Sequence, residues 1–195
     1  WGFRRPRSAP PSARELAEAR AAVRAAEIRL GGGRAFLPSS HTQLDFGGIG
    51  VGYGLDGAAE VLRARGISRA LIDVSGDVIA IGTPPGERGW PVEIAGAETR
   101  AGGSADAQVG GPEAPAPREV RLRDAALATS ANTESVVRYG SLAAGHVMDP
   151  RTGRPAHALR HVTVVARSAM AADAFATAAL VSGRQEAGVL QTLTR

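Results

Sequence analysis

A glycine-rich stretch constrains the fold of this chain more than any other feature of its sequence. It runs from Leu44 to Asp56 and reads LDFGGIGVGYGLD. Glycine has no Cβ, so its backbone can lie directly against a ligand or another segment. A helical pattern follows, and the free N–H groups at a helix start suit a phosphate. Asp45 would repel that phosphate unless a cation lay between them. The spacing fits neither the dinucleotide fingerprint nor the P-loop, and a turn whose glycines serve packing alone is an equal interpretation.

The composition limits the classes of function. All 23 basic residues are arginine, and the net charge is +4. These arginines are scattered, and aromatic residues make up only 4% of the chain, too few to stack on bases. We therefore expect no nucleic-acid partner. No apolar run approaches the roughly 18 residues of a membrane span, and the absence of cysteine excludes disulfides. We expect one domain over residues 1–195.

Local patterns predict an α+β fold with a mixed, largely antiparallel sheet and packed helices. Ser12 and Glu15 form a capping box at the start of the first helix, and Ser168 caps a later one. Helical spacing covers Ala13–Ile28, Leu55–Arg65, Ala169–Val181 and a last short element, Glu186–Leu193. Strand patterns cover Ala35–Leu37, Ala70–Val74, Val78–Gly82, Trp90–Ala95, Glu119–Arg123, Ala125–Thr129 and His161–Ala166.

A second informative stretch, His146 to Pro155, reads HVMDPRTGRP. Its Asp-Pro and Thr-Gly pairs are turn formers, so we expect a structured loop and no strand. Arginine forks suit phosphate oxygens, and a histidine can move a proton near neutral pH. A surface loop held by an Asp149–Arg151 pair is the alternative.

The third stretch is the helix Ser168 to Leu180, SAMAADAFATAAL. Asp173 and Thr177 are four residues apart and therefore project from one face. A carboxylate among apolar residues is costly to bury without a partner. Oxygen ligands on one helix face fit Mg²⁺ or Ca²⁺, with phosphate or water completing the shell. The pattern equally allows Asp173 to be buried against an arginine, with Thr177 bonding back into its own helix.

In this order the stretches LDFGGIGVGYGLD, IDVSGD, LATSAN, HVMDPRTGRP and SAMAADAFATAAL resemble the ApbE-type FAD:protein FMN transferases. The resemblance covers the chain from about Trp1 to Leu193, and the family's N-terminal part is apparently missing. The resemblance implies Mg²⁺ as a cofactor and FAD as a substrate. It implies transfer of FMN to a threonine hydroxyl of an acceptor protein, with release of AMP. It also suggests the cell envelope or periplasm as the localisation, with the cytoplasm as the alternative.

The resemblance assigns roles to particular residues. Asp173 and Thr177 match the family's metal ligands, and the backbone carbonyl of Gly48 is the expected third ligand. His146 matches the histidine suggested as the base that takes the threonine proton. Positions that contact FAD or border its cleft are Asp45, Gly47, Val51, Asp77, Thr129 and His146.

Three positions depart from the family pattern. Val51 stands where most members have lysine, Ser75 replaces a glycine, and Ala131 replaces the glycine of the ATSG segment. With the missing N-terminal part, Val51 leads us to expect that this chain binds FAD weakly and transfers little FMN. A non-catalytic relative that binds flavin nucleotide or a protein is therefore the alternative function.

The segment from Gly96 to Pro117 has hardly a large apolar side chain, so we expect a disordered insertion. Replacing it with a short Gly/Ser linker should shift the melting temperature by less than about 3 °C, the change expected from under ~1 kcal/mol in a domain of this size. Differential scanning calorimetry of the two proteins measures this shift. A much larger decrease would mean that the segment packs on the core.

Overall fold

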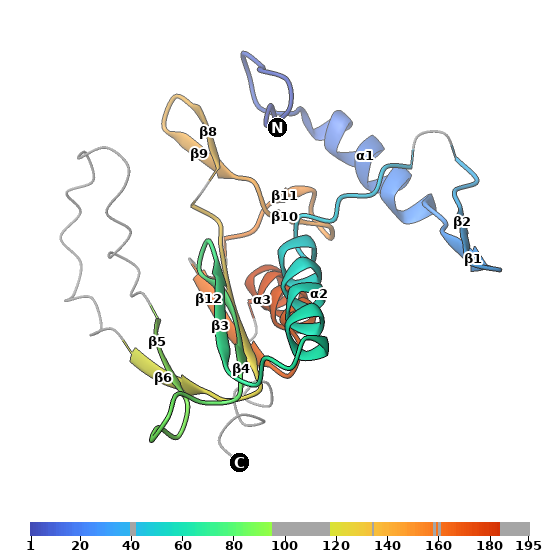
Figure 1. Ribbon diagram of the computed structural model, residues 1–195. Coiled ribbons are helices and arrows are strands. Elements are labelled where there is room, and N and C mark those ends of the chain that lie inside the picture. Colours follow the sequence, from blue (N-terminus) through green and yellow to red (C-terminus); the bar gives the residue numbers. More distant parts are fainter. Residues whose placement is uncertain (40–41, 95–117, 134, 158, 160, 184–195) are drawn as a thin grey trace.

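The computed structural model describes residues 1–39, 42–94, 118–133, 135–157, 159 and 161–183. The predicted insertion at 96–117 and the last predicted helix, Glu186–Leu193, lie outside these residues. Within them, the structure has three helices, a four-stranded sheet and several two-stranded hairpins (Figure 1). Every strand pair among the described residues is antiparallel. The predicted α+β class and the largely antiparallel sheet are thus confirmed.

The central sheet has the strand order β12-β7-β4-β3. Its strands are β3 (Ala70–Val74), β4 (Asp77–Ile81), β7 (Ala126–Ala131) and β12 (His161–Ala166). The predicted hairpin of β3 and β4 forms, and its two turn residues, Ser75 and Gly76, both have positive φ. β4 is buried from Val78 to Ile81 because both faces of the sheet are covered.

Helices α2 (Gly50–Ala64) and α3 (Ala169–Ser182) lie together on one face of this sheet (Figure 1). Their small apolar residues permit close packing on the strands. The core on this side contains buried residues of both helices and of β4 and β7: Leu55, Ala59, Ile79, Ile81, Ala126, Ala128, Ala169 and Ala172. This packing determines where the second half of α3 lies.

A hairpin of β5 (Trp90–Ile94) and β6 (Arg118–Leu122) packs on the other face. Val78, Ala80, Leu122, Leu127 and Val165 form the buried cluster there. The indole Nε1 of Trp90 donates to the Ile81 carbonyl oxygen at 3.1 Å, which links the hairpin to the end of β4.

The N-terminal region contains α1 (Ala13–Ala25) and a hairpin of β1 (Arg29–Gly31) and β2 (Arg34–Phe36). The predicted capping box of Ser12 and Glu15 is present. The prediction that α1 extends to Ile28 is wrong. The backbone is extended at Ala26, and Gly32 and Gly33 lie in the turn between β1 and β2.

Two further hairpins follow β7. They are formed by β8 (Val136–Tyr139) with β9 (Leu142–Gly145), and by β10 (Met148–Asp149) with β11 (Arg154–Pro155). The predicted strand-free loop at His146 to Pro155 is therefore wrong in part. Its turn formers close a minimal hairpin, since the Thr152 and Gly153 N–H groups both donate to the Asp149 carbonyl.

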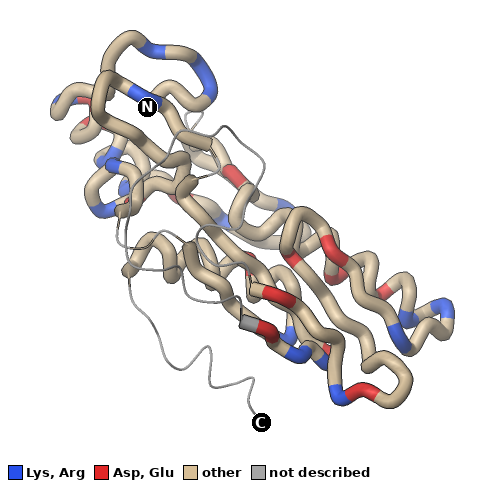
Figure 2. The backbone as a smooth tube through the Cα atoms, turned by 90° about the vertical axis from the view of Figure 1, so that its left-hand side faces the viewer, with Lys and Arg blue, Asp and Glu red and all other residues tan. Residues whose placement is uncertain are grey.

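Charged residues of both signs are interspersed along much of the backbone face shown in Figure 2. Among the described residues, no helix combines the length and apolar character needed to cross a membrane.

The predicted start of α2 at Leu55 is wrong, because the helix begins at Gly50, inside the glycine-rich stretch. Gly52 lies against the first residues of α3. A Cβ at Gly52 would contact the Ala169 carbonyl and come within 2.6 Å of the Met170 Cα. Helix propensity alone disfavours these glycines, so close contact between the helices explains at least Gly52.

Alanine at Gly52 should therefore separate the two helices and destabilise the fold by about 1–3 kcal/mol. Gly54 lies in the same helix with no other atom near its missing Cβ, so Gly54→Ala should stabilise by about 0.5–1 kcal/mol. Urea unfolding of both variants measures these opposite signs. Equal effects at the two positions would contradict the close contact.

Candidate functional site

A cavity of about 630 Å³ lies where the glycine-rich stretch, the β10–β11 turn and the second half of α3 meet. Its lining residues come from three segments far apart in the sequence: Asp45, Gly48 and Ile49, then Pro150 and Arg151, then Ala174, Thr177, Ala178, Val181 and Ser182. The three stretches singled out in the sequence are therefore neighbours in space.

Thr177 faces both the glycine-rich stretch and the sheet. A Cβ at Gly48 would lie 3.1 Å from Thr177 Oγ1, so the glycine lets the backbone approach that hydroxyl. On its other side, Thr177 Oγ1 is 2.9 Å from the Ser130 Oγ of β7. The alternative interpretation, in which Thr177 bonds back into its own helix, is wrong because its hydroxyl bonds to the sheet.

Asp173 lies one helical turn before Thr177 and is only 6% exposed. Its Oδ2 accepts a hydrogen bond from the Gly52 backbone N–H at 3.1 Å. The partner of this buried carboxylate is thus a backbone donor of α2, and the alternative of a buried arginine partner is wrong. Oδ1 makes no hydrogen bond with the described residues.

These groups fit a hard cation in their chemistry. They offer one carboxylate oxygen and one hydroxyl, and the backbone of Gly48 lies close to that hydroxyl. Within the described ranges, no group of three or more His, Asp or Glu side chains could hold a metal. An ion at this site would therefore take part of its shell from water or phosphate oxygens.

Asp45 lies at the cavity in an exposed turn. Its Oδ1 accepts the Gly47 N–H at 2.9 Å, and its Oδ2 is 3.0 Å from Arg4 Nη2. The Gly47 hydrogen bond, and then the Arg4 guanidinium, hold the pKa of Asp45 below its ordinary value. The carboxylate is thus ionised at neutral pH. Because both partners of the ion pair are more than 70% exposed, the pair itself adds little stability.

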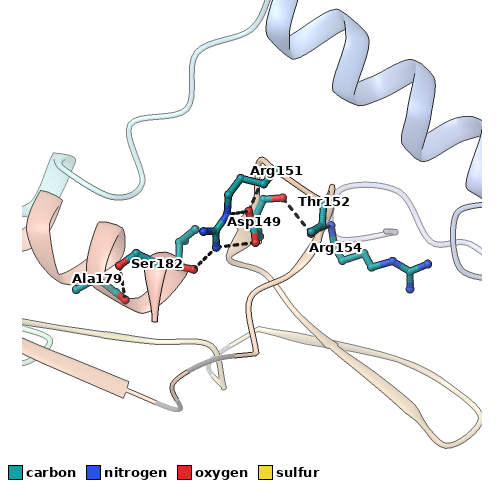
Figure 3. A network of polar contacts seen from close by, with 7 residues as sticks. Asp149, Arg151, Thr152, Arg154, Ala179 and Ser182 are labelled. Atoms are coloured by element: carbon teal, nitrogen blue, oxygen red, sulfur yellow. Dashed lines mark hydrogen bonds and ion pairs between the residues drawn. The ribbon is translucent and has the colours of Figure 1, made fainter. Parts of the chain in front are cut away.

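The β10–β11 hairpin is joined to the end of α3 by Arg151 (Figure 3). The guanidinium makes a two-point contact with Asp149, Nε to Oδ1 at 2.9 Å and Nη2 to Oδ2 at 2.9 Å. Nη2 also donates to the Val181 carbonyl at 3.1 Å, one of the carbonyls that a helix end leaves unpaired. The predicted Asp149–Arg151 pair is confirmed, and it holds a wall of the cavity.

The remaining predicted residues lie outside the cavity lining. Asp77 Oδ1 accepts the Thr129 N–H at 3.1 Å, so these two are brought together at the sheet. Val51 is 39% exposed in the first turn of α2. His146 is exposed directly after β9, and its side chain makes no hydrogen bond or ion pair with the described residues.

Sequence reasoning missed two polar residues that shape the site, Ser130 and Asn132. The Asn132 Oδ1 accepts the Val147 N–H at 2.8 Å, and its Nδ2 donates to the Ala156 carbonyl at 2.7 Å. Asn132 thereby holds both ends of the β10–β11 hairpin. The only signal in the sequence is a run of polar residues directly after a buried strand pattern.

A second cavity, of about 420 Å³, lies between α1 and the same hairpin. Trp1 lines it and donates from Nε1 to the Gly153 carbonyl at 2.8 Å, while the Tyr139 hydroxyl donates to the Trp1 carbonyl at 2.6 Å. These contacts fasten the N-terminal segment to both hairpins.

Comparison with known proteins places these motifs in a family. The family model described as ApbE family matches residues 1–193. Among curated proteins, the FAD:protein FMN transferase of Klebsiella pneumoniae (strain 342) is 29% identical over 200 residues, covering 96% of this chain and 52% of that protein. The Rhodobacter capsulatus protein of the same name is 34% identical over 145 residues, covering 74% of this chain and 25% of that protein.

Solved structures agree. The crystal structure of the Thermotoga maritima ApbE protein superposes with a TM-score of 0.75 at 25% identity, covering 98% of this chain and 59% of the other. Apo flavinyl transferase ApbE from Pseudomonas stutzeri gives 0.71 at 28% identity, covering 93% and 53%. This chain spans about half the length of the first of these curated relatives.

The contact between Arg151 and Asp149 leads to a prediction about the titration of Asp149. Its hydrogen bonds, with a smaller contribution from Arg20, hold the pKa of Asp149 below its ordinary value. A carboxyl whose pKa is lowered in the folded state stabilises the fold above its unfolded pKa, and this contribution is lost as the pH falls through the lowered value. Arg151→Met should therefore raise the pKa of Asp149, as followed by NMR titration of the carboxyl carbon.

Arg154→Met is the matched control. The Arg154 guanidinium points away from the network in Figure 3 and makes no hydrogen bond or ion pair with the described residues. The pKa of Asp149 should therefore be unchanged in that variant. A pKa that responds equally to both substitutions would show that Asp149 senses only overall charge.

Proposed function

This chain belongs to the ApbE family, and we propose that the protein transfers FMN from FAD to a threonine hydroxyl of an acceptor protein, in a Mg²⁺-dependent reaction that releases AMP. Relatives matching nearly the whole chain are named FAD:protein FMN transferase, which supports the transferase activity. The metal, the threonine and the AMP product are the finer parts of the proposal. Since the chain spans about half of those relatives, the activity of the whole protein is itself proposed.

The single observation that carries this proposal is the cavity at the second half of α3. It joins Gly48 and Thr177, which resemble metal-ligand positions, to Asp45 and Arg151 on its other walls. A cation at this cavity suits a diphosphate, because it can bind the diphosphate oxygens. A bound cation would also offset the repulsion between the Asp45 carboxylate and a phosphate group.

Asp173, Thr177 and the Gly48 carbonyl are the residues proposed to hold Mg²⁺. When bound, Mg²⁺ neutralises the diphosphate and stabilises charge on the leaving phosphate. The Gly52 N–H occupies one oxygen of Asp173 and leaves the other for the ion. Arg151 lines the opposite wall, where Asp149 and the Val181 carbonyl hold its guanidinium. Contacts with the rest of FAD are proposed for Asp45, Gly47, Val51, Asp77 and Thr129.

In the proposed transfer, the threonine Oγ forms a bond to the FMN phosphorus, and the bond from that phosphorus to the oxygen that leaves with AMP breaks. His146 takes the threonine proton as general base. Its exposure leaves it accessible to an acceptor, and Asn132 fixes the adjacent residue, Val147.

One observation favours the alternative of a binding protein without catalysis. Val51 places a short apolar side chain at the start of α2, where the resemblance implies lysine in most family members, and no lysine occurs in this chain. The missing contact is a charge-assisted hydrogen bond. Losing one of these costs about 1.5–3 kcal/mol.

Val51→Lys should therefore raise the affinity for FAD in the presence of Mg²⁺ by roughly 10- to 150-fold, as measured by isothermal calorimetry. Val51→Met is the control, because methionine is similar in length to lysine but uncharged, and this variant should bind FAD as the parent does. Thr177→Val should remove the Mg²⁺ dependence, and Thr177→Ser, which retains the hydroxyl, should restore it.

The same proteins test the reaction when incubated with FAD, Mg²⁺ and a threonine-bearing acceptor. In-gel fluorescence should show covalent flavin on the acceptor with Val51→Lys and little with the parent. Labelling should disappear when Thr177→Val is added. Tight Mg²⁺-dependent binding of FAD without any labelling would contradict the transferase activity and favour the alternative function, a binding protein without catalysis.

A further inference from the structure

Asp56, on α2, binds the start of α3. Its Oδ1 accepts the Ala169 N–H at 2.7 Å, and its Oδ2 accepts the Met170 N–H at 3.0 Å. The Ser168 Oγ accepts the next free N–H, that of Ala171, at 3.2 Å. The first N–H groups of a helix have no partner within it, and here two of them are satisfied by a residue 113 and 114 positions earlier.

The reverse contact connects the same two helices. Gly52 is the third residue of α2, which has no side-chain cap at Ile49. Its N–H donates to Asp173 on α3. Each helix therefore uses a carboxylate of the other to satisfy its first turn. We call the contacts of Asp56 and Asp173 with the opposite helix the reciprocal cap.

The reciprocal cap fixes how far α3 lies along α2. All of these contacts join the first two turns of the two helices, and Gly52 touches Ala169 between them, so a shift of either helix along its axis would strain the hydrogen bonds. Thr177 follows Asp173 by one turn and meets Gly48. Displacement of the α3 start would therefore move both proposed metal ligands relative to the Gly48 carbonyl.

We propose that Asp56 is a positioning residue for the metal site, acting through the first turn of α3. The expected effect on metal binding rests on the proposed function. The positioning itself rests on the hydrogen bonds described above. Asp56 does not line the cavity. It holds the α3 start in place, and so it keeps Asp173 on the Gly52 N–H and Thr177 beside Gly48.

Ser168 provides the matched control. It caps the same turn of α3 from within the helix, so Ser168→Ala weakens the helix start and leaves the contacts between helices in place. Asp56→Asn has nearly the same shape, but its amide offers one acceptor oxygen where the carboxylate offers two. Both variants lose about one capping hydrogen bond, and only Asp56→Asn loosens the reciprocal cap.

The first measurement is amide hydrogen exchange of the 195-residue chain by NMR, without metal or nucleotide. Exchange at Gly52 reports its bond to Asp173, and exchange at Ile79 and Ile81 in β4 reports global unfolding. Relative to β4, Gly52 protection should fall roughly 10-fold in Asp56→Asn, as for the loss of one hydrogen bond, and should be unchanged in Ser168→Ala. Equal behaviour of the two variants overturns the proposal.

The second measurement is the affinity for Mn²⁺ in the presence of FAD, followed by the electron spin resonance of free Mn²⁺ well below the melting temperature of every variant. Asp56→Asn should weaken binding about 10-fold, whereas Ser168→Ala should bind as the parent does. If the parent binds Mn²⁺ and Asp56→Asn binds equally well, the proposal is overturned. If the parent binds none, the proposed metal-dependent function fails, and Gly52 exchange still decides whether Asp56 positions Asp173.

Discussion

The contact between α2 and α3 is the constraint on which the rest of this structure depends. Two carboxylates, Asp56 and Asp173, each satisfy N–H groups at the start of the opposite helix. Gly52 allows the backbones to approach closely enough for these bonds to form. Buried carboxylates are costly without donors, and helix starts carry unpaired donors. The unpaired N–H groups of each helix start bind a carboxylate of the other helix, so both costs are removed together. The packing of the helices and their hydrogen bonds therefore favour the same geometry.

The candidate site follows from that geometry. Because the start of α3 is fixed against α2, its second half passes the glycine-rich stretch, and Thr177 meets Gly48 on one side and Ser130 on the other. Only one carboxylate lies among the proposed metal ligands. A site with so few anionic ligands binds Mg²⁺ best when a substrate supplies phosphate oxygens. Metal binding and nucleotide binding are therefore expected to depend on one another.

The β10–β11 hairpin forms the opposite wall, and it is held from two directions. Arg151 bonds to Asp149 within the hairpin and to the Val181 carbonyl at the end of α3. Asn132, just beyond β7, bonds to both ends of the hairpin. The hairpin is thus fixed to the sheet and to the helix at once. His146 lies two residues before this hairpin, and its side chain is exposed.

The sequence by itself determined the features that depend on neighbouring residues. The Ser12–Glu15 capping box, the Ser168 cap, the β3–β4 hairpin and the Asp149–Arg151 pair each involve residues within a few positions. The motifs also identified the three stretches that meet at the cavity, through their resemblance to one family. Tertiary structure alone decided the partners of Asp56, Asp173 and Thr177, and it started α2 five residues earlier than propensity suggested. The physical reason is that a local cap needs only one turn of chain, whereas these partners are 47 to 121 positions apart and meet only when the helices pack.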